Sequence, residues 1–225
     1  MQSRKVTGLA LIVGTLSMFV GIAVHPHHGP VAEDSAGQNN AFANTVVIVI
    51  VLASFGLLGV GFLQLLRSTA PHPWNDVACI ALAIAGICGS LAGIIGHLVV
   101  PRLVEHVNAA DQSDQAMVNI VVANDMILSA SLVQTSFAAW AIGVVCLSIS
   151  MLHSSTGWKI VGACGIALGL GIVLALVLGR LQISLHNIGL VVLASGIWVI
   201  AIGAGLAANK SFAELPPRRE TADEK

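Results

Sequence analysis

Long apolar runs separated by short polar segments dominate the chain. Each run has about the 20 residues that an α-helix needs to cross a hydrocarbon core roughly 30 Å thick. The runs are continuous and lack the alternation of apolar and polar residues that marks the strands of a membrane barrel. The pattern predicts an all-α membrane protein with six transmembrane helices arranged as three hairpins. The predicted spans lie near residues 6–24, 44–66, 77–100, 126–151, 160–179 and 187–207.

The composition agrees with lipid as the solvent. Only 9% of the residues are charged and 56% are hydrophobic, whereas soluble domains carry about 25% charged residues. Residues 1–207 are therefore predicted to form one transmembrane domain. The segment 208–225 contains Pro216-Pro217-Arg218-Arg219 and is predicted to be a disordered tail. The apolar spans indicate the lipid bilayer as a partner. A net charge of −1 suggests no nucleic-acid partner.

The basic residues predict the orientation, because cytoplasmic loops carry the excess of Lys and Arg. With six spans, one side holds eight of the ten basic residues and the other side holds Arg102 and Arg180. We therefore expect both termini in the cytoplasm and an inner (plasma) membrane location. The eight are Arg4, Lys5, Arg67, Lys159, Lys210, Arg218, Arg219 and Lys225.

The first span has an alternative interpretation, because Arg4-Lys5 before an apolar run also describes a secretory signal peptide. The run is longer than a typical signal core, and residues 25–28 offer no small-x-small cleavage site. The triplet at 41–43 fits that pattern but lies too far downstream. We expect the first span to be retained, and cleavage would leave the other five spans unchanged.

A repeated Gly/His signature occurs in the first and third spans. It reads Gly14-x6-Gly21-x3-His25 and Gly86-x6-Gly93-x3-His97. At 100° per residue each histidine lies about 20° from the first glycine and about 40° from the second. Both histidines are thus predicted to face protein, and the repeat favours duplicated hairpins.

Glycines at helical spacing predict packed helix faces, because association in lipid depends on small residues that let backbones approach. The last span contributes such a face with Gly189, Gly196 and Gly203. The other predicted packing residues are Gly14, Gly21, Gly86, Gly89, Gly93, Gly162 and Gly169.

Six histidines fall on the predicted outer side, where they could serve a cofactor. Neutral imidazole is a common ligand of metals and of haem iron. The candidate haem ligands are His25, His97 and His186, and the candidate copper or zinc ligands are His25, His27, His28, His106 and Asp125. The competing interpretation is that these are interfacial histidines bonded to neighbouring carbonyl groups.

The fourth span carries a polar stripe of Asn124, Ser131, Gln134 and Thr135. Polar groups in lipid face partners or cavities, so the stripe predicts hydrogen bonds between helices or a path for a small neutral solute. The middle third of the spans lacks ionisable residues, which disfavours a coupled transporter. The connection 101–125 is predicted to be helical and to extend the third and fourth spans, with Asp111, Ser113 or Asp114 as a cap.

Catalytic motifs are absent from the sequence: it contains no Gly-x-Ser-x-Gly, no His-Glu-x-x-His and no phosphate-binding glycine loop. The four cysteines lie inside spans without metal-ligand spacing. We therefore expect a protein that is not an enzyme.

The first span ending in His25-Pro26 and the third ending in Gly-His-Leu-Val-Val-Pro at 96–101 resemble a broad set of uncharacterised small bacterial inner-membrane proteins with six helices. The resemblance implies no known activity. Three functions stay open: a structural, interaction or accessory role, with a homo-oligomer or another membrane protein as partner; a haem- or metal-binding protein; and a permease for a small neutral solute.

Overall fold

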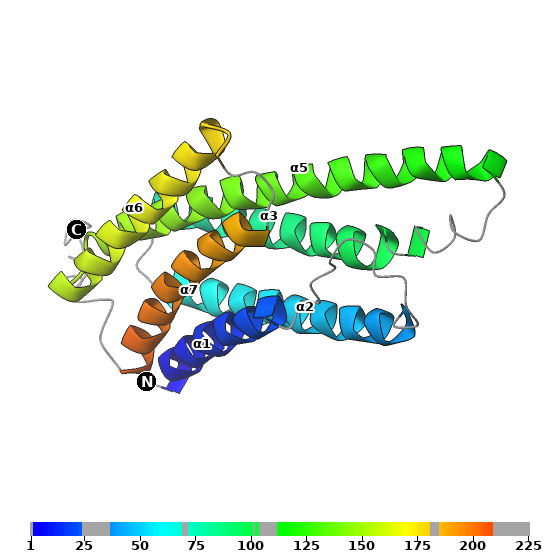
Figure 1. Ribbon diagram of the computed structural model, residues 1–225. Helices are drawn as coiled ribbons and strands as arrows, with labels where there is room; N and C mark the ends of the chain where they lie inside the picture. The colour runs from blue at the N-terminus through cyan, green and yellow to red at the C-terminus, as the bar shows by residue number, and fades with distance from the viewer. Residues whose placement is uncertain are drawn as a thin grey trace, which may run out of the picture.

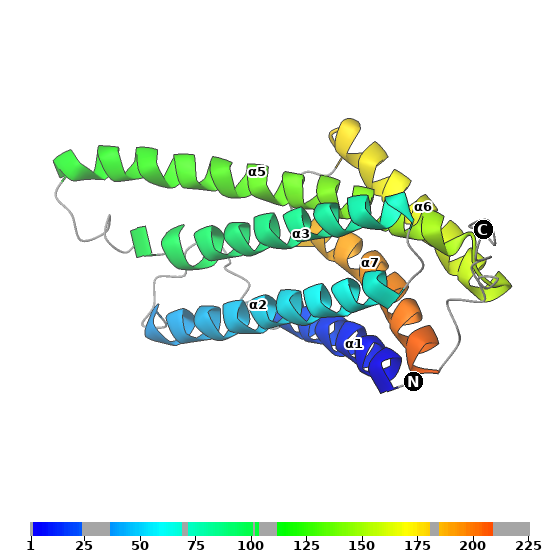
Figure 2. The same ribbon diagram turned by 180° about the vertical axis from the view of Figure 1, so that it is seen from behind.

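The protein is all-helical in the part of the chain that the computed structural model describes, residues 2–23, 37–68, 72–100, 102–103, 112–180 and 185–208. Figure 1 and, from behind, Figure 2 show the helices as a bundle of long rods. The helices are α1 (Gln2–Ala23), α2 (Gly37–Ser68), α3 (Pro73–Ile94), η1 (Ile95–Val99), α5 (Gln112–Met151), α6 (Thr156–Val177) and α7 (Leu185–Ala207).

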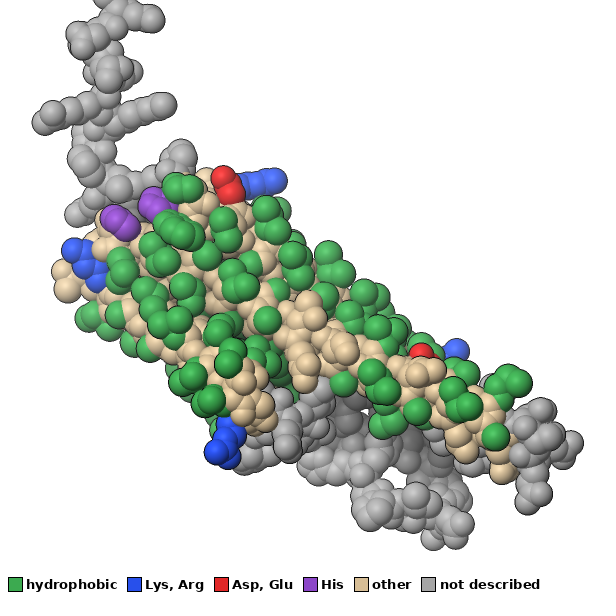
Figure 3. Space-filling model, turned by 90° about the horizontal axis from the view of Figure 1, so that it is seen from above, with side chains coloured by type: hydrophobic (Ala, Val, Ile, Leu, Met, Phe, Trp, Pro, Cys, Tyr) green, Lys and Arg blue, Asp and Glu red, His purple; other side chains and the backbone are tan. Residues whose placement is uncertain are grey.

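Six of these helices are long and apolar enough to cross a membrane, which confirms the predicted number of spans. Apolar side chains cover the middle of the bundle on the face shown in Figure 3, and the charged side chains lie toward its ends. The spans are Arg4–Ala23, Thr45–Arg67, Pro73–Ile94, Gln115–Met151, Thr156–Val177 and Ile188–Ala207.

The ends of α3 follow from its sequence. Pro73 is the first residue of the helix, where its missing N–H would have had no helical partner. His72 precedes it in extended conformation and accepts a hydrogen bond from the Trp74 N–H at 3.4 Å. At the other end the helix widens into the π-helical turn η1. Pro101 lies four residues after His97 in η1, and a proline ring clashes with the carbonyl four residues before it, which favours the wider turn.

Helix α5 is much longer than a single membrane crossing. Its 40 residues correspond to about 60 Å at 1.5 Å per residue, and its first turns project past the other helices in Figure 1. This confirms that the connection before the fourth span is helical from Gln112 onward. Of the predicted caps, Ser113 and Asp114 lie inside the helix, and Asp111 lies outside the described residues.

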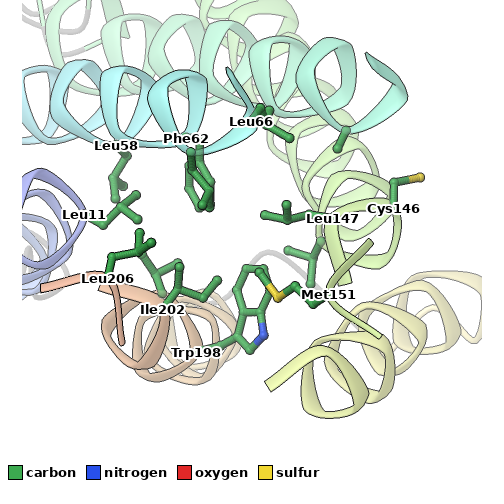
Figure 4. Packing of buried hydrophobic residues seen from close by; sticks show 14 of the residues in the cluster. Leu11, Leu58, Phe62, Leu66, Cys146, Leu147, Met151, Trp198, Ile202 and Leu206 are labelled. Carbon is green, nitrogen blue, oxygen red and sulfur yellow. The ribbon is translucent and has the colours of Figure 1, made fainter. Parts of the chain in front are cut away.

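The six long helices form a closed ring. Each packs against the next in the chain, and α7 returns to pack against α1. The contacts of α3 with α5 are the most extensive, while α2 touches α3, and α6 touches α7, only lightly. Figure 4 shows the helices surrounding a cluster of large apolar side chains. The grouping into three hairpins stays a prediction, because α6 and α7 each pack more closely on another helix than on each other.

The hydrophobic core fills one half of this ring, the half that contains Gln2 and Ala207. All six long helices contribute to it, and Figure 4 shows most of its side chains pointing toward a common centre. We call this half the core end and the other half the far end. The core residues with the lowest exposure are Leu11, Leu65, Ala78, Val144, Leu147, Met151, Trp158, Val199, Ile202 and Leu206.

Candidate functional site

A cavity of about 630 Å³ lies inside the ring, next to the core. Five helices line it, namely α1, α2, α3, α5 and α7. Phe62 and Trp140 form its border with the core; their rings meet edge to face with centroids 5.7 Å apart. The cavity is therefore enclosed by helices that are distant in the sequence.

The lining is almost entirely apolar, and most of its few polar groups already have partners. Thr15 Oγ1 donates to the Leu11 carbonyl at 2.8 Å, and Trp140 Nε1 donates to Ser195 Oγ at 3.0 Å. Ser136 Oγ donates to the Ala85 carbonyl at 2.8 Å. The hydroxyl of Ser90, which also lines the cavity, has no hydrogen bond to the described residues. A ligand in this cavity would thus meet an apolar wall with few available polar groups, the Ser90 hydroxyl and the O–H of Ser195, whose oxygen accepts from Trp140.

The packing of α3 on α5 leaves a gap between α3 and α2. Serines of α5 donate to α3 carbonyls in the middle of α3 and near its far end, Ser136 to Ala85 and Ser129 to Ala92, the latter at 3.2 Å. Midway along α3, the side chain of Leu82 packs on Gly143 of α5, where an added Cβ would lie 2.7 Å from Leu82 Cγ. These contacts hold α3 to α5, so that α2 and α3 meet only lightly.

The cavity opens sideways through this gap. The lining residues of α2 and α3 that are exposed are Gly56, Gly59, Leu63, Ala83, Ile87 and Leu91. A Cβ added to Gly56 or Gly59 would meet no atom within 4 Å. These residues lie within helices that are long and apolar enough to cross a membrane, so the opening lies between the two ends of these candidate spans.

A second cavity of about 350 Å³ adjoins the first toward the far end. The two share lining residues from several helices, among them Met18, Phe55, Ser90 and Phe137. Phe55 lies at the boundary of the two cavities, because it lines both of them. A Cβ added to Gly89, which lines the second cavity, would lie 3.0 Å from the Phe55 Cζ. The interior of the ring is therefore hollow over much of its length beyond the core.

The glycines that were predicted to pack do not all have the same surroundings. A Cβ added to Gly14 would lie 3.0 Å from Leu58 Cγ, and one on Gly21 would lie 2.9 Å from Val51 Cγ2, so both approach α2 closely. Gly162 and Gly169 approach α5 closely, with the Ser148 and Ala141 carbonyl oxygens 2.7 Å and 2.8 Å from the added Cβ.

Gly86 and Gly93 differ from these glycines. A Cβ added to either would meet no atom within 4 Å, and they line the first and second cavity respectively. The glycines that correspond in the sequence repeat thus occupy different environments. The physical reason is that α3 packs on α5 through a neighbouring stripe, which includes Ala85 and Ala92, while Gly86 and Gly93 border the hollow interior.

Most of the predicted cofactor ligands lie outside the described residues: His25, His27, His28 and His106. For His97 in η1 and His186 at the start of α7 only the backbone is described. Asp125 is half-buried on α5. Among the described side chains no three of His, Cys, Asp and Glu come together as a metal site. The haem, copper and zinc sites stay predictions.

The predicted polar stripe lies on the outside of α5. Asn124, Ser131, Gln134 and Thr135 are all exposed, and none of them lines either cavity. Ser131 Oγ donates to the Ile127 carbonyl and Thr135 Oγ1 to the Ser131 carbonyl, both at 2.9 Å within the helix. Among the described residues the stripe thus lines neither cavity and makes no hydrogen bond to another helix, and its role in a solute path stays a prediction.

Sequence reasoning missed the residues that surround the cavity, including Thr15, Ser90, Trp140 and Ser195. It also missed the approach of His72 to His153, whose ring centroids lie 5.4 Å apart at the core end. The signal for Ser90 was a polar residue on the glycine-rich face of α3, and that for Ser136 was a serine in line with Gly143 of α5, but helical phase alone cannot show that two such faces border the same space.

Comparison of the chain with protein families, with curated proteins and with solved structures gives no match. The resemblance to small bacterial inner-membrane proteins thus stays a prediction, and the cavity is interpreted from its own geometry.

Proposed function

We propose that this chain is an accessory protein of the inner (plasma) membrane, without enzymatic activity, that holds one lipophilic molecule inside its helix ring. The observation that carries the proposal is the apolar cavity of about 630 Å³ that opens between α2 and α3. Its volume falls within the range of about 300–1,000 Å³ that is typical of small-molecule sites.

The chemistry of the lining supports an apolar ligand over water. A bound water needs two to four polar partners, and large apolar cavities stay dry and take up apolar molecules. In this cavity Thr15, Ser136 and Trp140 donate to carbonyls or to Ser195 Oγ, which leaves the hydroxyl of Ser90 and the O–H of Ser195. The ligand class is therefore a hydrocarbon-like molecule with at most one polar group, such as an isoprenoid alcohol or a fatty acyl chain.

The sideways opening supports entry from the bilayer. A molecule dissolved in lipid would pass between Gly59 of α2 and Ile87 of α3 without crossing water. A permease is less well supported, because the residues predicted to line its path lie on the outer surface of α5.

Filling the cavity tests the proposal. Gly86→Phe places a ring in the cavity, because Gly86 lines the cavity and a Cβ added there meets no atom within 4 Å. Gly171→Phe is the matched control, since it is also mid-helix and free of neighbours but exposed on the outside of α6. Both variants replace glycine with a better helix former, so the backbone effect is shared and both should fold.

The measurement is photolabelling in membranes with a palmitate analogue that carries a diazirine in its chain. We expect labelled peptides from residues 79–91 and 136–140 in the parent and in Gly171→Phe. In Gly86→Phe this labelling should fall to the level seen with a competing excess of unlabelled palmitate. Labelling that Gly86→Phe leaves unchanged, or that is confined to outward-facing residues, would contradict the proposal.

The proposed topology is three hairpins with both termini in the cytoplasm, supported by eight basic residues on one side against two on the other. Reporter fusions after residues 70 and 154 should be active with a cytoplasmic reporter. A fusion after residue 108 should be active only with a periplasmic reporter. The reverse pattern would overturn the orientation and leave the cavity unaffected.

A further inference from the structure

The side chain of Gln134 on α5 is exposed and makes no hydrogen bond to the described residues. Its neighbours on the polar stripe, Ser131 and Thr135, bond to carbonyls of their own helix. The Gln134 amide has two donors and an acceptor. Unlike the hydroxyls of Ser131 and Thr135, it makes no hydrogen bond to a carbonyl of its own helix. It is therefore the polar group on this surface that most needs a partner.

The depth of Gln134 makes this need strong. In α5 it lies between Ser129 and Ser136, which bond to Ala92 and Ala85 of α3. The span of α3 ends at Ile94, so Gln134 lies roughly 10 Å inside that end at 1.5 Å per residue. This level is within the hydrocarbon core, where polar side chains turn toward partners.

Gln134 belongs to a regular seam along α5. Residues separated alternately by three and four positions fall on one stripe of a helix, the spacing of a coiled coil. The members from 117 to 134 are all exposed, although three of them are large apolar residues. We call this set the α5 seam: Met117, Ile120, Asn124, Ile127, Ser131 and Gln134.

Helix α6 covers the same stripe farther along α5, which explains why the seam is free only in its first half. The next positions are Ala138, which is half-buried, and Ala141, which is fully buried. Gly169 of α6 packs against Ala141, and toward the far end α6 diverges from α5 in Figure 1. The stripe is thus a helix-packing face whose first half has no partner helix among the described residues.

We propose that the α5 seam binds the α5 seam of a second copy of this chain, in a parallel homodimer with a two-fold axis along the membrane normal. Copies inserted in one membrane have the same orientation, so a two-fold axis pairs each seam residue with its own counterpart. Amide side chains suit this symmetry because each one donates and accepts hydrogen bonds. Gln134 would pair with Gln134 of the second copy, and Asn124 with its own counterpart there. A single polar residue at such a position also fixes the register of two helices.

Cysteine cross-linking tests the geometry with adjacent residues. Ile127 is in the seam and 64% exposed, whereas Met126 is 60% exposed and faces about 100° away. In full-length chains whose four native cysteines are replaced by alanine, Ile127→Cys should form a disulfide-linked dimer in membranes upon mild oxidation. Met126→Cys should remain monomeric at the same protein-to-lipid ratio.

The hydrogen bond is tested by dimer affinity, measured by energy transfer between labelled chains in lipid vesicles. Gln134→Leu should raise the dissociation constant about tenfold, the effect expected of an interhelical hydrogen bond in lipid. Thr135→Val is the control, because Thr135 bonds to its own helix, and it should leave the constant unchanged.

Three outcomes would overturn the dimer: equal cross-linking through both cysteines, equal affinity of the Leu and Val variants, or cross-linking of Ile127→Cys only to a different protein. The cavity proposal is independent of all three, since the seam and the cavity share no residue.

Discussion

Replacing Gly203 with valine is expected to force α1 and α7 apart and to lower the free energy of unfolding by about 3 kcal/mol or more, the upper part of the range for overpacked sites. Gly203 is buried in α7 against α1. An added Cβ would lie 2.8 Å from the carbonyl oxygen of Gly8 and 2.7 Å from Ile12 Cγ1. A Cβ on Gly8 would in turn collide with the Gly203 carbonyl oxygen. The two backbones touch, so relief requires moving a whole helix.

Gly189→Val provides the matched control, because it makes the same change in the same helix where an added Cβ meets no atom within 4 Å. We expect it to be as stable as the parent or slightly more so. Unfolding in mixed micelles with increasing SDS, followed by far-UV circular dichroism, measures both. If Gly203→Val unfolds at the same SDS fraction as Gly189→Val, the close contact of α1 with α7 is wrong.

The spans were predictable because lipid imposes a strong local requirement. Every backbone group in the hydrocarbon must be bonded within its helix, so the length of an apolar run determines a span without knowledge of its neighbours. The predicted spans 44–66 and 187–207 therefore agree closely with Thr45–Arg67 and Ile188–Ala207. The third span was predicted to start near residue 77, four residues after Pro73, where α3 begins. The polar residues Asn75 and Asp76 interrupt the apolar pattern, although they belong to the helix.

Helical phase predicted which residues share one face of a helix. It did not predict which neighbouring helix or cavity that face borders. Gly14 and Gly86 occupy the same place in the repeat, yet Gly14 packs on Leu58 and Gly86 faces open space. The difference arises from α5, whose serines hold α3 away from α2. Such a choice between partner helices depends on side-chain fit over the whole contact, which no single helix encodes.

The cavity and the α5 seam were hidden for related reasons. Thr15, Ser90 and Ser195 lie on three helices, and only their assembly places them around one space. The polar stripe was recognised in the sequence, but its exposure follows from the direction in which α6 leaves α5. Both features belong to the arrangement of helices in three dimensions, which pairwise packing decides after the spans have formed.

Trp198→Ala is expected to be the most destabilising single truncation, with a loss of about 3–5 kcal/mol, as for other buried tryptophans. Trp198 is 5% exposed and belongs to the core. Its Nε1 donates to the Val161 carbonyl of α6 at 2.9 Å. Its ring also packs on Gly165, where an added Cβ would lie 2.7 Å from Nε1.

The effect should be large because Trp198 is one of two tryptophans that join helices α6 and α7, which contact each other lightly; the other is Trp158 of α6, which packs on Gly205 of α7. Trp198→Phe keeps most of the ring contact and removes the hydrogen bond, so we expect a smaller loss of about 1 kcal/mol. Ile197→Ala is the control in lipid contact, since Ile197 is 61% exposed, and it should change stability little. SDS titrations that rank the three variants in this order support a ring closed through Trp198. Equal stability of the Trp198→Ala and Ile197→Ala variants would mean that Trp198 contributes nothing to holding α6 against α7.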